Sequence, residues 1–393
     1  MNEKAILFAD IGFSQCSKHG QKVCGDVFKF RRITEENRVF AALSDGLGSG
    51  IKANILANMT ATMALKFMSA NMEMTRSAEI MMEALPLCRE LEIGYATFSL
   101  IDIMLDGTVK MVEMGNPEFL AFRAGENFIP AYAGNAQVKC GDQTLRICEF
   151  AVKQDDRLIL MSDGISQTGS GTDNTPAGWG VNGCRQFLAG IVSANPAITA
   201  LELADQMIRE ALRREPAYRA GDDMTCAVIH FRQPRRLMLV TGPPFDPAKD
   251  AVIARDVAEF PGKKVICGGT TAGIIARELA RELSIPASGA KDGLPPCSTL
   301  PGMDLVTEGI YTLTRAAQYL EGNFDEIRNN AAGQLAKLLI CNDIIEFHVG
   351  TRINQAHQDP NLPIELEIRR SIIKRIAATL QKKYYKNVII KYF

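Results

Sequence analysis

Two strand-like stretches of this sequence end in the same tripeptide, Ser-Asp-Gly. The first, "RVFAAL", runs into Asp45 and Gly46, and the second, "DRLILM", runs into Asp163 and Gly164. Asp-Gly alone is the commonest signal of a hairpin turn, but apolar residues after Gly50 recur at helical spacing rather than strand spacing. We therefore expect a strand, a glycine loop and a helix. A carboxylate in such a loop suits a metal or phosphate site, because glycines let the backbone come close.

Two further acidic motifs accompany these tripeptides. "CGDVF" contains Asp26, and "GDDMT" contains Asp222 and Asp223. One Asp-Gly pair is more often a turn than a ligand, but each of these motifs stands at a strand boundary. Strand ends of a sandwich can converge on one edge, where carboxylates repel one another unless cations neutralise them. Oxygen ligands without His or Cys favour Mg²⁺ or Mn²⁺ over Zn²⁺, so the motifs predict an acidic metal site.

Length and composition narrow the class of protein. A chain of 393 residues predicts two domains. The net charge of −1 provides no field that would attract nucleic acid or an anionic membrane surface. We find no apolar run long enough to cross a bilayer. The 10 cysteines include no Cys-x-x-Cys pair, so we expect buried thiols in a reducing cytoplasm rather than a disulfide or zinc framework.

The order of expected elements differs between the two halves of the chain. Residues 1–232 contain strand-like runs around a hairpin signal at Asp106-Gly107, with helical stretches between them, which predicts an α+β fold: an antiparallel β-sandwich flanked by helices. "RQPRR" marks a boundary with its proline and charges. Residues 237–393 then alternate strand and helix, which predicts a smaller, parallel, doubly wound α/β domain.

The second domain contains a candidate anion site. Gly268, Gly269, Thr270 and Thr271 stand between an expected strand and an expected helix, where free amides favour phosphate. The alternative is a threonine N-cap on a purely structural helix. "VTGPP" and a polar loop with Arg352 and His357 are expected at the same sheet edge. This domain is therefore expected to be regulatory or ligand-sensing.

The acidic motifs of the first domain also occur in a known order. "CGD", "SDGLGSG", "SDGI" and "DDMT" together resemble the PPM-type metal-dependent serine/threonine protein phosphatases, in particular the bacterial branch typified by the stage II sporulation protein E phosphatase domain. The resemblance covers residues 1–232. It implies a pair of antiparallel sheets flanked by helices, which agrees with the element pattern.

The resemblance implies a role for each matching residue. Asp26 and Asp45 would bridge two Mn²⁺ or Mg²⁺ ions, and the Gly46 carbonyl would be a further ligand. Asp163 and Asp222 would complete the shell of the second ion, and Asp223, at a position often held by Asn, is an additional candidate. A hydroxide bridging the ions would attack phosphoserine or phosphothreonine directly. The implied substrate is a phosphoprotein in signalling, such as an anti-sigma-factor antagonist.

Two departures from the eukaryotic members of this family leave other functions open. Leu47 stands where those members carry a histidine proposed as general acid, and no arginine near the N-terminus matches their phosphate-binding arginine. Lys18, His19 or Lys22 could replace that arginine or could be ordinary loop residues. We expect slow turnover, below about 100 s⁻¹. A pseudophosphatase or binding scaffold and a small-molecule phosphohydrolase are the alternatives, and the sequence does not indicate an oligomeric state.

Overall fold

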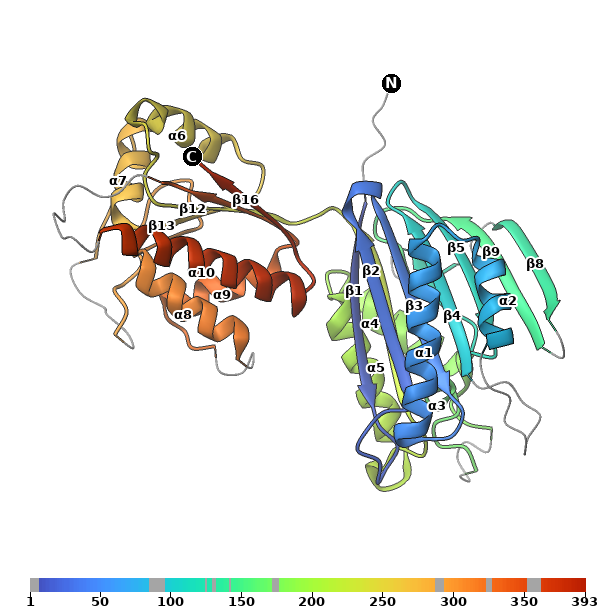
Figure 1. Cartoon of the computed structure of the whole chain (residues 1–393). Coiled ribbons are helices and arrows are strands. Elements are labelled where there is room, and N and C mark those ends of the chain that lie inside the picture. Colours follow the sequence, from blue (N-terminus) through green and yellow to red (C-terminus); the bar gives the residue numbers. More distant parts are fainter. Residues whose placement is uncertain are drawn as a thin grey trace. The chain divides into compact units, whose positions relative to one another are not determined.

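The computed structural model describes residues 7–84, 96–123, 126–128, 132–140, 143–171, 177–286, 293–322, 327–351 and 362–393. The chain divides into two compact units, Met1–Gln233 and Pro234–Phe393 (Figure 1). Each unit has its own sheets and its own hydrophobic core. None of the described helices combines the length and the hydropathy that a membrane span requires. Arg352 and His357, expected at the edge of the second domain, lie outside the described residues.

The first unit contains a six-stranded antiparallel sheet in the order β2-β3-β4-β5-β9-β8. The predicted turn at Asp106-Gly107 joins β4 to β5 and is confirmed, with Gly107 at a φ of 104°. The strands are β2 (Asp26–Ile33), β3 (Arg38–Gly46), β4 (Ala96–Met104), β5 (Thr108–Met114), β8 (Tyr132–Cys140) and β9 (Gln143–Ala151).

A five-stranded antiparallel sheet packs against the first one, in the order β1-β11-β10-β6-β7. The first and last strands of the unit, β1 and β11, pair along their whole length, from Phe8 opposite Arg232 to Cys16 opposite Met224. The strands are β1 (Phe8–Cys16), β6 (Leu120–Arg123), β7 (Glu126–Asn127), β10 (Arg157–Met161) and β11 (Met224–Arg232).

Helices cover both outer faces of this sandwich (Figure 1). The six-stranded sheet packs against α1 (Gly50–Ser69) and α2 (Met74–Ala84), and the five-stranded sheet against α4 (Gly180–Ala194) and α5 (Ala200–Arg214). Fully buried alanines repeat along α1 at 53, 57, 61 and 64, so the helix lies close to the sheet. The described part of this unit also contains three short helices: η1 (Thr34–Glu36), α3 (Asp163–Ser166) and η2 (Pro216–Tyr218). The predicted α+β sandwich is confirmed.

The second unit is built on a parallel sheet in the order β14-β13-β12-β15-β16. The chain runs outward from β12 to β14 and then returns to the other side of β12, which confirms the doubly wound arrangement. The strands are β12 (Arg236–Thr241), β13 (Lys263–Cys267), β14 (Leu305–Thr307), β15 (Ile344–Val349) and β16 (Asn387–Tyr392).

Both faces of the parallel sheet carry helices. One face packs against α6 (Asp250–Glu259) and α7 (Gly269–Glu278), through side chains such as Ile253 and Ile275. The other packs against α8 (Ile310–Glu321), α9 (Ala331–Cys341) and α10 (Leu362–Lys382), through Leu313, Leu335 and Ile373. A short η3 (Pro247–Lys249) precedes α6.

Candidate metal centre

Asp26 and Asp45 lie directly opposite each other on neighbouring strands. Asp26 is the first residue of β2, Asp45 is the last but one of β3, and the antiparallel register pairs them. Their carboxyl groups are close enough to share a hydrogen bond. The six-stranded sheet therefore brings together two of the acidic motifs that the sequence singled out.

The five-stranded sheet supplies the other two acidic motifs. Asp163 begins α3 just after β10, and it lies close enough to Asp45 to help raise the pKa of that carboxyl group. Asp222 and Asp223 directly precede β11, the strand that pairs with β10. Asp222 is close enough to Asp163 to raise its pKa, and Asp223 does the same to Asp26. Aspartates from four chain segments thus meet at one edge of the sandwich.

The buried carboxylates share a pattern: the protein donates a hydrogen bond to one oxygen of each. Thr225 Oγ1 donates to Asp26 Oδ2 over 2.8 Å, and the backbone N–H of Lys18 donates to Asp223 Oδ1 over 2.9 Å. Within the described residues, the second oxygens, Asp26 Oδ1 and Asp223 Oδ2, are buried without a donor. Gln167 Nε2 likewise donates to Asp163 Oδ2 over 3.0 Å.

This pattern fits a divalent cation. Leaving a buried carboxylate oxygen without a partner is costly, and Mg²⁺ or Mn²⁺ takes oxygen ligands of this kind. A donor on the other oxygen orients a ligating carboxylate, as outer-shell partners do in metal sites. Across the part of the chain that the structure describes, however, no three His, Cys, Asp or Glu side chains form a ready cluster for one ion. The carboxylates meet in pairs, so the ligands would have to close around a cation.

Burial and mutual repulsion strongly raise the pKa values of these carboxyl groups. Burial, followed by the charges of Asp26 and Asp163, raises the pKa of Asp45 to about 9. Burial raises the pKa of Asp26 to about 6, and it also raises the pKa of Asp163. In each case the low-dielectric site disfavours the carboxylate form. A bound cation would reverse that preference.

Two glycines let the backbone close around this edge. A Cβ on Gly46 would lie 2.0 Å from the carbonyl oxygen of Ala53, so the end of β3 packs directly against α1. A Cβ on Gly164 would lie 2.1 Å from the carbonyl oxygen of Asp223, so α3 packs directly against the segment before β11. At both positions any residue other than glycine would force the backbone to shift.

The two residues of the double aspartate differ in burial. Asp223 is 3% exposed and lies among the buried carboxylates. The Asp222 side chain is 46% exposed, and its carboxylate accepts from the Asp223 N–H and pairs with Lys18 Nζ at 3.5 Å. Asp223, the additional candidate, is therefore the more deeply placed of the two. The motifs did not predict that Thr225, the last residue of "DDMT", and the Lys18 backbone would donate hydrogen bonds to these carboxylates.

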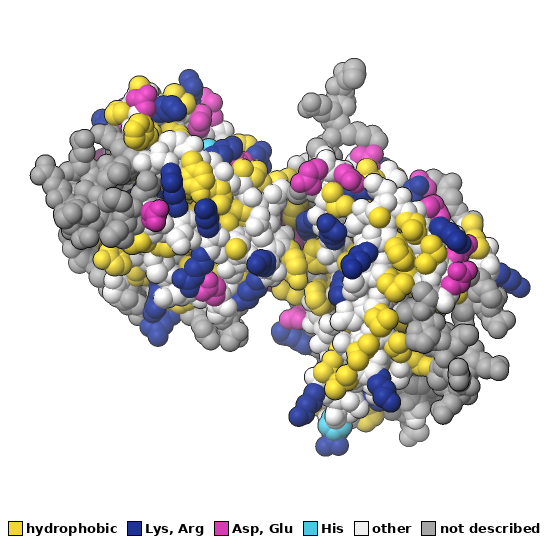
Figure 2. All heavy atoms as spheres, viewed as in Figure 1, with side chains coloured by type: hydrophobic (Ala, Val, Ile, Leu, Met, Phe, Trp, Pro, Cys, Tyr) yellow, Lys and Arg dark blue, Asp and Glu magenta, His cyan; other side chains and the backbone are white. Residues whose placement is uncertain are grey.

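An apolar strip begins in the same loop. Figure 2 shows exposed hydrophobic side chains along α1, and the residues involved are Leu47, Ile51, Ile55 and Met59, each at least 40% exposed. Leu47 directly follows Asp45 and Gly46, and it has no proton to donate to a leaving group. We call these four residues the α1 strip.

The sequence comparisons concern this first unit. The model of the family described as Stage II sporulation protein E (SpoIIE) matches residues 35–232, which is about half of the 393 residues. Stage II sporulation protein E of Bacillus subtilis (strain 168) is 26% identical over 224 residues, 56% of this chain and 25% of that protein. The Priestia megaterium protein of the same name is 25% identical over 226 residues, 57% of this chain and 36% of that protein. The chain thus spans between a quarter and about a third of the length of these relatives.

The structure of the PP2C phosphatase domain and a fragment of the regulatory domain of SpoIIE from Bacillus subtilis aligns with 57% of this chain and 62% of its own. The TM-score is 0.47 and the sequence identity is 22%.

Proposed function

The chain belongs to the stage II sporulation protein E family, and on that premise we propose that its first unit is a metal-dependent protein serine/threonine phosphatase. The proposal rests on two buried carboxylates at this edge, those of Asp26 and Asp223. In each, one oxygen accepts a hydrogen bond from the protein, and the other oxygen has no donor among the described residues. Such an edge is costly to bury without cations. The substrate class is phosphoserine or phosphothreonine on a signalling protein.

The residues available to hold two Mn²⁺ or Mg²⁺ ions are those the motifs predicted. Asp26 and Asp45 are the pair best placed to be shared, since they face each other across two strands. The Gly46 carbonyl, Asp163, Asp222 and Asp223 are the further candidate ligands. Two such ions, when bound, supply Lewis acidity and activate water for direct attack on phosphorus.

The chain's own groups orient this site. Thr225 and the Lys18 backbone hold Asp26 and Asp223 so that one oxygen of each remains for ligation. Lys18 Nζ pairs with Asp222 at 3.5 Å at the exposed rim, and its positive charge would attract the phosphate group of a substrate. Because Leu47 follows Asp45-Gly46, the leaving oxygen must take its proton from water or from the substrate's surroundings, which supports slow turnover.

The first test is hydrolysis of p-nitrophenyl phosphate across a range of Mn²⁺ concentrations, for the wild type and Asp45→Asn. We expect Mn²⁺-dependent activity that falls at least about 100-fold in the variant, since a shared ligand is lost. Asp106→Asn, in the β4–β5 turn, is the matched control and should retain activity. Activity that survives Asp45→Asn, or that needs no metal, would refute the proposed centre.

A binding scaffold without catalysis is the second candidate function. It is favoured by the pairwise carboxylate arrangement in the described residues and by Leu47. Calorimetric titration with Mn²⁺ separates the possibilities: binding without hydrolysis of any phosphate ester supports a metal-binding scaffold, and no binding supports a scaffold whose acidic edge has another purpose.

The α1 strip supports a protein substrate rather than a small molecule, because exposed apolar surface beside a reactive edge is a contact for another protein. We expect Ile55→Ser to lower kcat/KM for a phosphorylated anti-sigma-factor antagonist by about threefold to tenfold, the loss typical of an apolar contact. Hydrolysis of p-nitrophenyl phosphate should be unchanged. Met104→Ser, at an exposed apolar position of β4, is the control. A small-molecule phosphohydrolase would lose neither activity.

The second unit is proposed as a regulatory or ligand-sensing domain. Its doubly wound parallel sheet supports this assignment, because such sheets bind ligands at the carboxyl ends of their strands.

A further inference from the structure

Two helices of the second unit begin side by side, each with a glycine at its N-cap. Gly268 precedes α7 and Gly309 precedes α8, and a Cβ on Gly309 would lie 3.6 Å from the Gly268 Cα. In the described structure neither N-cap position provides a capping side chain. The first N–H groups of a helix lack intrahelical acceptors and carry the positive end of its dipole. Two such positive ends therefore lie side by side.

A buried hydroxyl group lies in the first turn of α8. Thr312 is 0% exposed, and its Oγ1 has no hydrogen-bond partner among the described residues. Thr312 is the third residue of α8, and the Cα–Cβ bonds of a helix tilt toward its N-terminus, so its side chain leaves the helix toward the end that Gly309 begins. An unpaired buried hydroxyl is rare and calls for a ligand or a water.

A second such hydroxyl lies at the end of β12. Thr241 is 1% exposed, and within the described part of the chain its Oγ1 also has no partner. The register places Thr241 beside Cys267, and Cys267 beside Thr307, whose Oγ1 donates to the Cys267 sulfur over 3.3 Å. A polar row thus crosses the carboxyl ends of three strands, directly before the glycines that begin α7 and α8.

We propose that this edge binds the phosphate group of a small phosphorylated molecule. The positive ends of α7 and α8 would face the phosphate oxygens, and the hydroxyls of Thr241 and Thr312 would donate to them. The edge formed by the carboxyl ends of parallel strands is where doubly wound sheets bind ligands. The predicted segment Gly268–Thr271 supplies only one side of this site, and α8 supplies the other. The proposal is independent of the reaction proposed for the first unit.

Glu308 sets the selectivity of this site. Its carboxylate lies 3.7 Å from where a Cβ on Gly269 would be, at the N-terminus of α7. This negative charge opposes a bound phosphate and lowers its affinity. The same carboxylate accepts hydrogen bonds, so it favours a phosphate ester that carries sugar hydroxyls over free phosphate.

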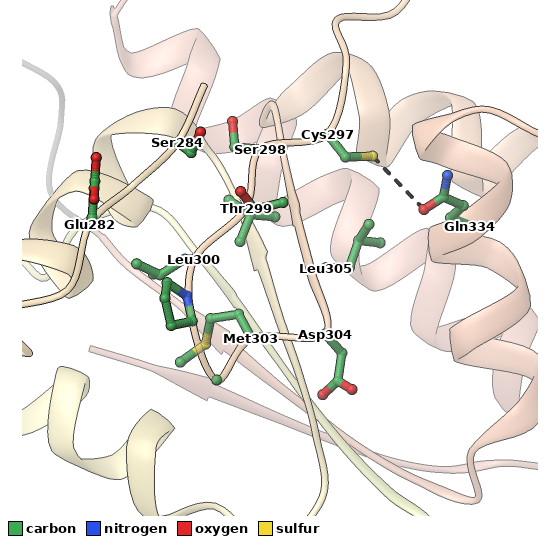
Figure 3. Close-up of a pocket in the computed structure, with 13 residues that line it drawn as sticks. Glu282, Ser284, Cys297, Ser298, Thr299, Leu300, Met303, Asp304, Leu305 and Gln334 are labelled. Atoms are coloured by element: carbon green, nitrogen blue, oxygen red, sulfur yellow. Dashed lines mark hydrogen bonds between the residues drawn. The ribbon is translucent and has the colours of Figure 1, made fainter. Parts of the chain in front are cut away.

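A hollow elsewhere in this unit lacks these features. It has a volume of about 600 Å³ and lies beside β14 (Figure 3). The carboxylates of Glu282 and Asp304 line it, together with the thiol of Cys297, whose Sγ contacts Gln334 Oε1 at 4.0 Å. No lysine or arginine is among the described residues that line it. Without a lysine or arginine among its described lining residues it is a poor site for phosphate, and it therefore serves as an internal control.

The test is calorimetric titration of the full chain in EDTA, so that metal in the first unit does not capture the probe. The probes are inorganic phosphate, ribose 5-phosphate and ADP. We expect one or both esters to bind more tightly than inorganic phosphate. Thr312→Val should weaken that binding about tenfold, the loss expected for one hydrogen bond to a charged group. Thr314→Val is the matched control, because its hydroxyl is already bonded to the Ile310 carbonyl.

Glu308→Gln gives the second arm. It should tighten inorganic phosphate binding and reduce the preference for the esters. Removing an unpaired buried hydroxyl should not lower the melting temperature, so loss of binding in Thr312→Val with an unchanged melting temperature supports the site. The proposal is overturned if the wild type binds none of the probes. It is also overturned if Thr312→Val and Thr314→Val bind alike, or if Ser298→Ala in the hollow causes the larger loss.

Discussion

The two units use the same local connection, a strand that ends in glycine and leads into a helix, but with opposite charge. In the first unit, β3 ends in Asp45-Gly46 and buried carboxylates gather at the edge of the sandwich. In the second, β13 leads through Gly268 into α7, and helix N-termini and hydroxyls gather instead. The connection alone therefore does not determine the ligand. The groups beside it do: carboxylates favour cations, and backbone amides together with hydroxyls favour anions.

The glycines of the two connections also differ in how closely the backbone packs around them. This difference gives the largest expected effect on stability. Gly46→Ala would place a Cβ 2.0 Å from the Ala53 carbonyl oxygen. We expect a loss of about 3 kcal/mol in the free energy of unfolding of the first unit, seen as a melting temperature about 10 °C lower. A melting temperature within 2 °C of the wild type would show that β3 and α1 do not need this close approach.

A smaller effect should follow from removing one orienting hydrogen bond. Thr225→Val deletes the donor to Asp26 Oδ2 while keeping the shape of the side chain. We expect Mn²⁺ affinity to fall about 10-fold to 100-fold, as for other outer-shell partners of metal ligands. Calorimetry measures this directly, and Thr144→Val, an exposed position of β9, is the control. Equal Mn²⁺ affinities in the two variants would show that Thr225 does not orient a metal ligand.

The charge difference between the edges should also appear as a pH dependence. The pKa values of Asp45 and Asp26, about 9 and about 6, lie above the value of about 4 for an unfolded chain. Between these values the folded state without metal keeps protons that the unfolded state releases, so its stability falls as the pH rises. In EDTA we expect the first unit to melt about 5 °C lower at pH 8.5 than at pH 5.5. Mn²⁺ or Asp45→Asn should reduce the difference, and stability that rises with pH in this window would contradict the assignment.

The smallest effect is expected in the second unit, at Gly269, the glycine that follows Gly268 in the corresponding connection. Gly269 is in the first turn of α7, and a Cβ there would have only ordinary contact with Glu308. Gly269→Ala should therefore raise the free energy of unfolding of this unit by about 0.5 kcal/mol. A loss comparable to that of Gly46→Ala would mean that the two connections are packed alike.

The sequence predicted the sandwich, the parallel sheet and the acidic motifs because each depends on local patterns. A Ser-Asp-Gly tripeptide after an apolar run can be recognised within one short segment of the sequence. The sequence pattern does not predict β9 (Gln143–Ala151) or most of β8 (Tyr132–Cys140), and the Gly, Asn, Gln and Lys residues of β8 have little strand preference. The pairing of β8 with β9 provides the missing stabilisation.

The finer site contacts depend on register and on distant segments. Thr225 lies two residues after Asp223, and the alternation of a strand places such residues on one face, so this partner could have been found from "DDMT". The deeper burial of Asp223 than of Asp222 follows from where the chain enters β11, which no motif encodes. The carboxylate of Glu308 beside Gly269 joins positions 39 apart and is visible only in the fold.

The pairing of β1 with β11 has a consequence for biosynthesis. The acidic edge depends on Asp26 meeting Thr225, which is 199 residues later in the chain, and on the first strand of the unit pairing with its last. A nascent chain leaves the ribosome from its N-terminus, and contacts so distant in sequence form late. The acidic edge of the first unit can therefore assemble only after translation has passed Arg232 and that strand has emerged.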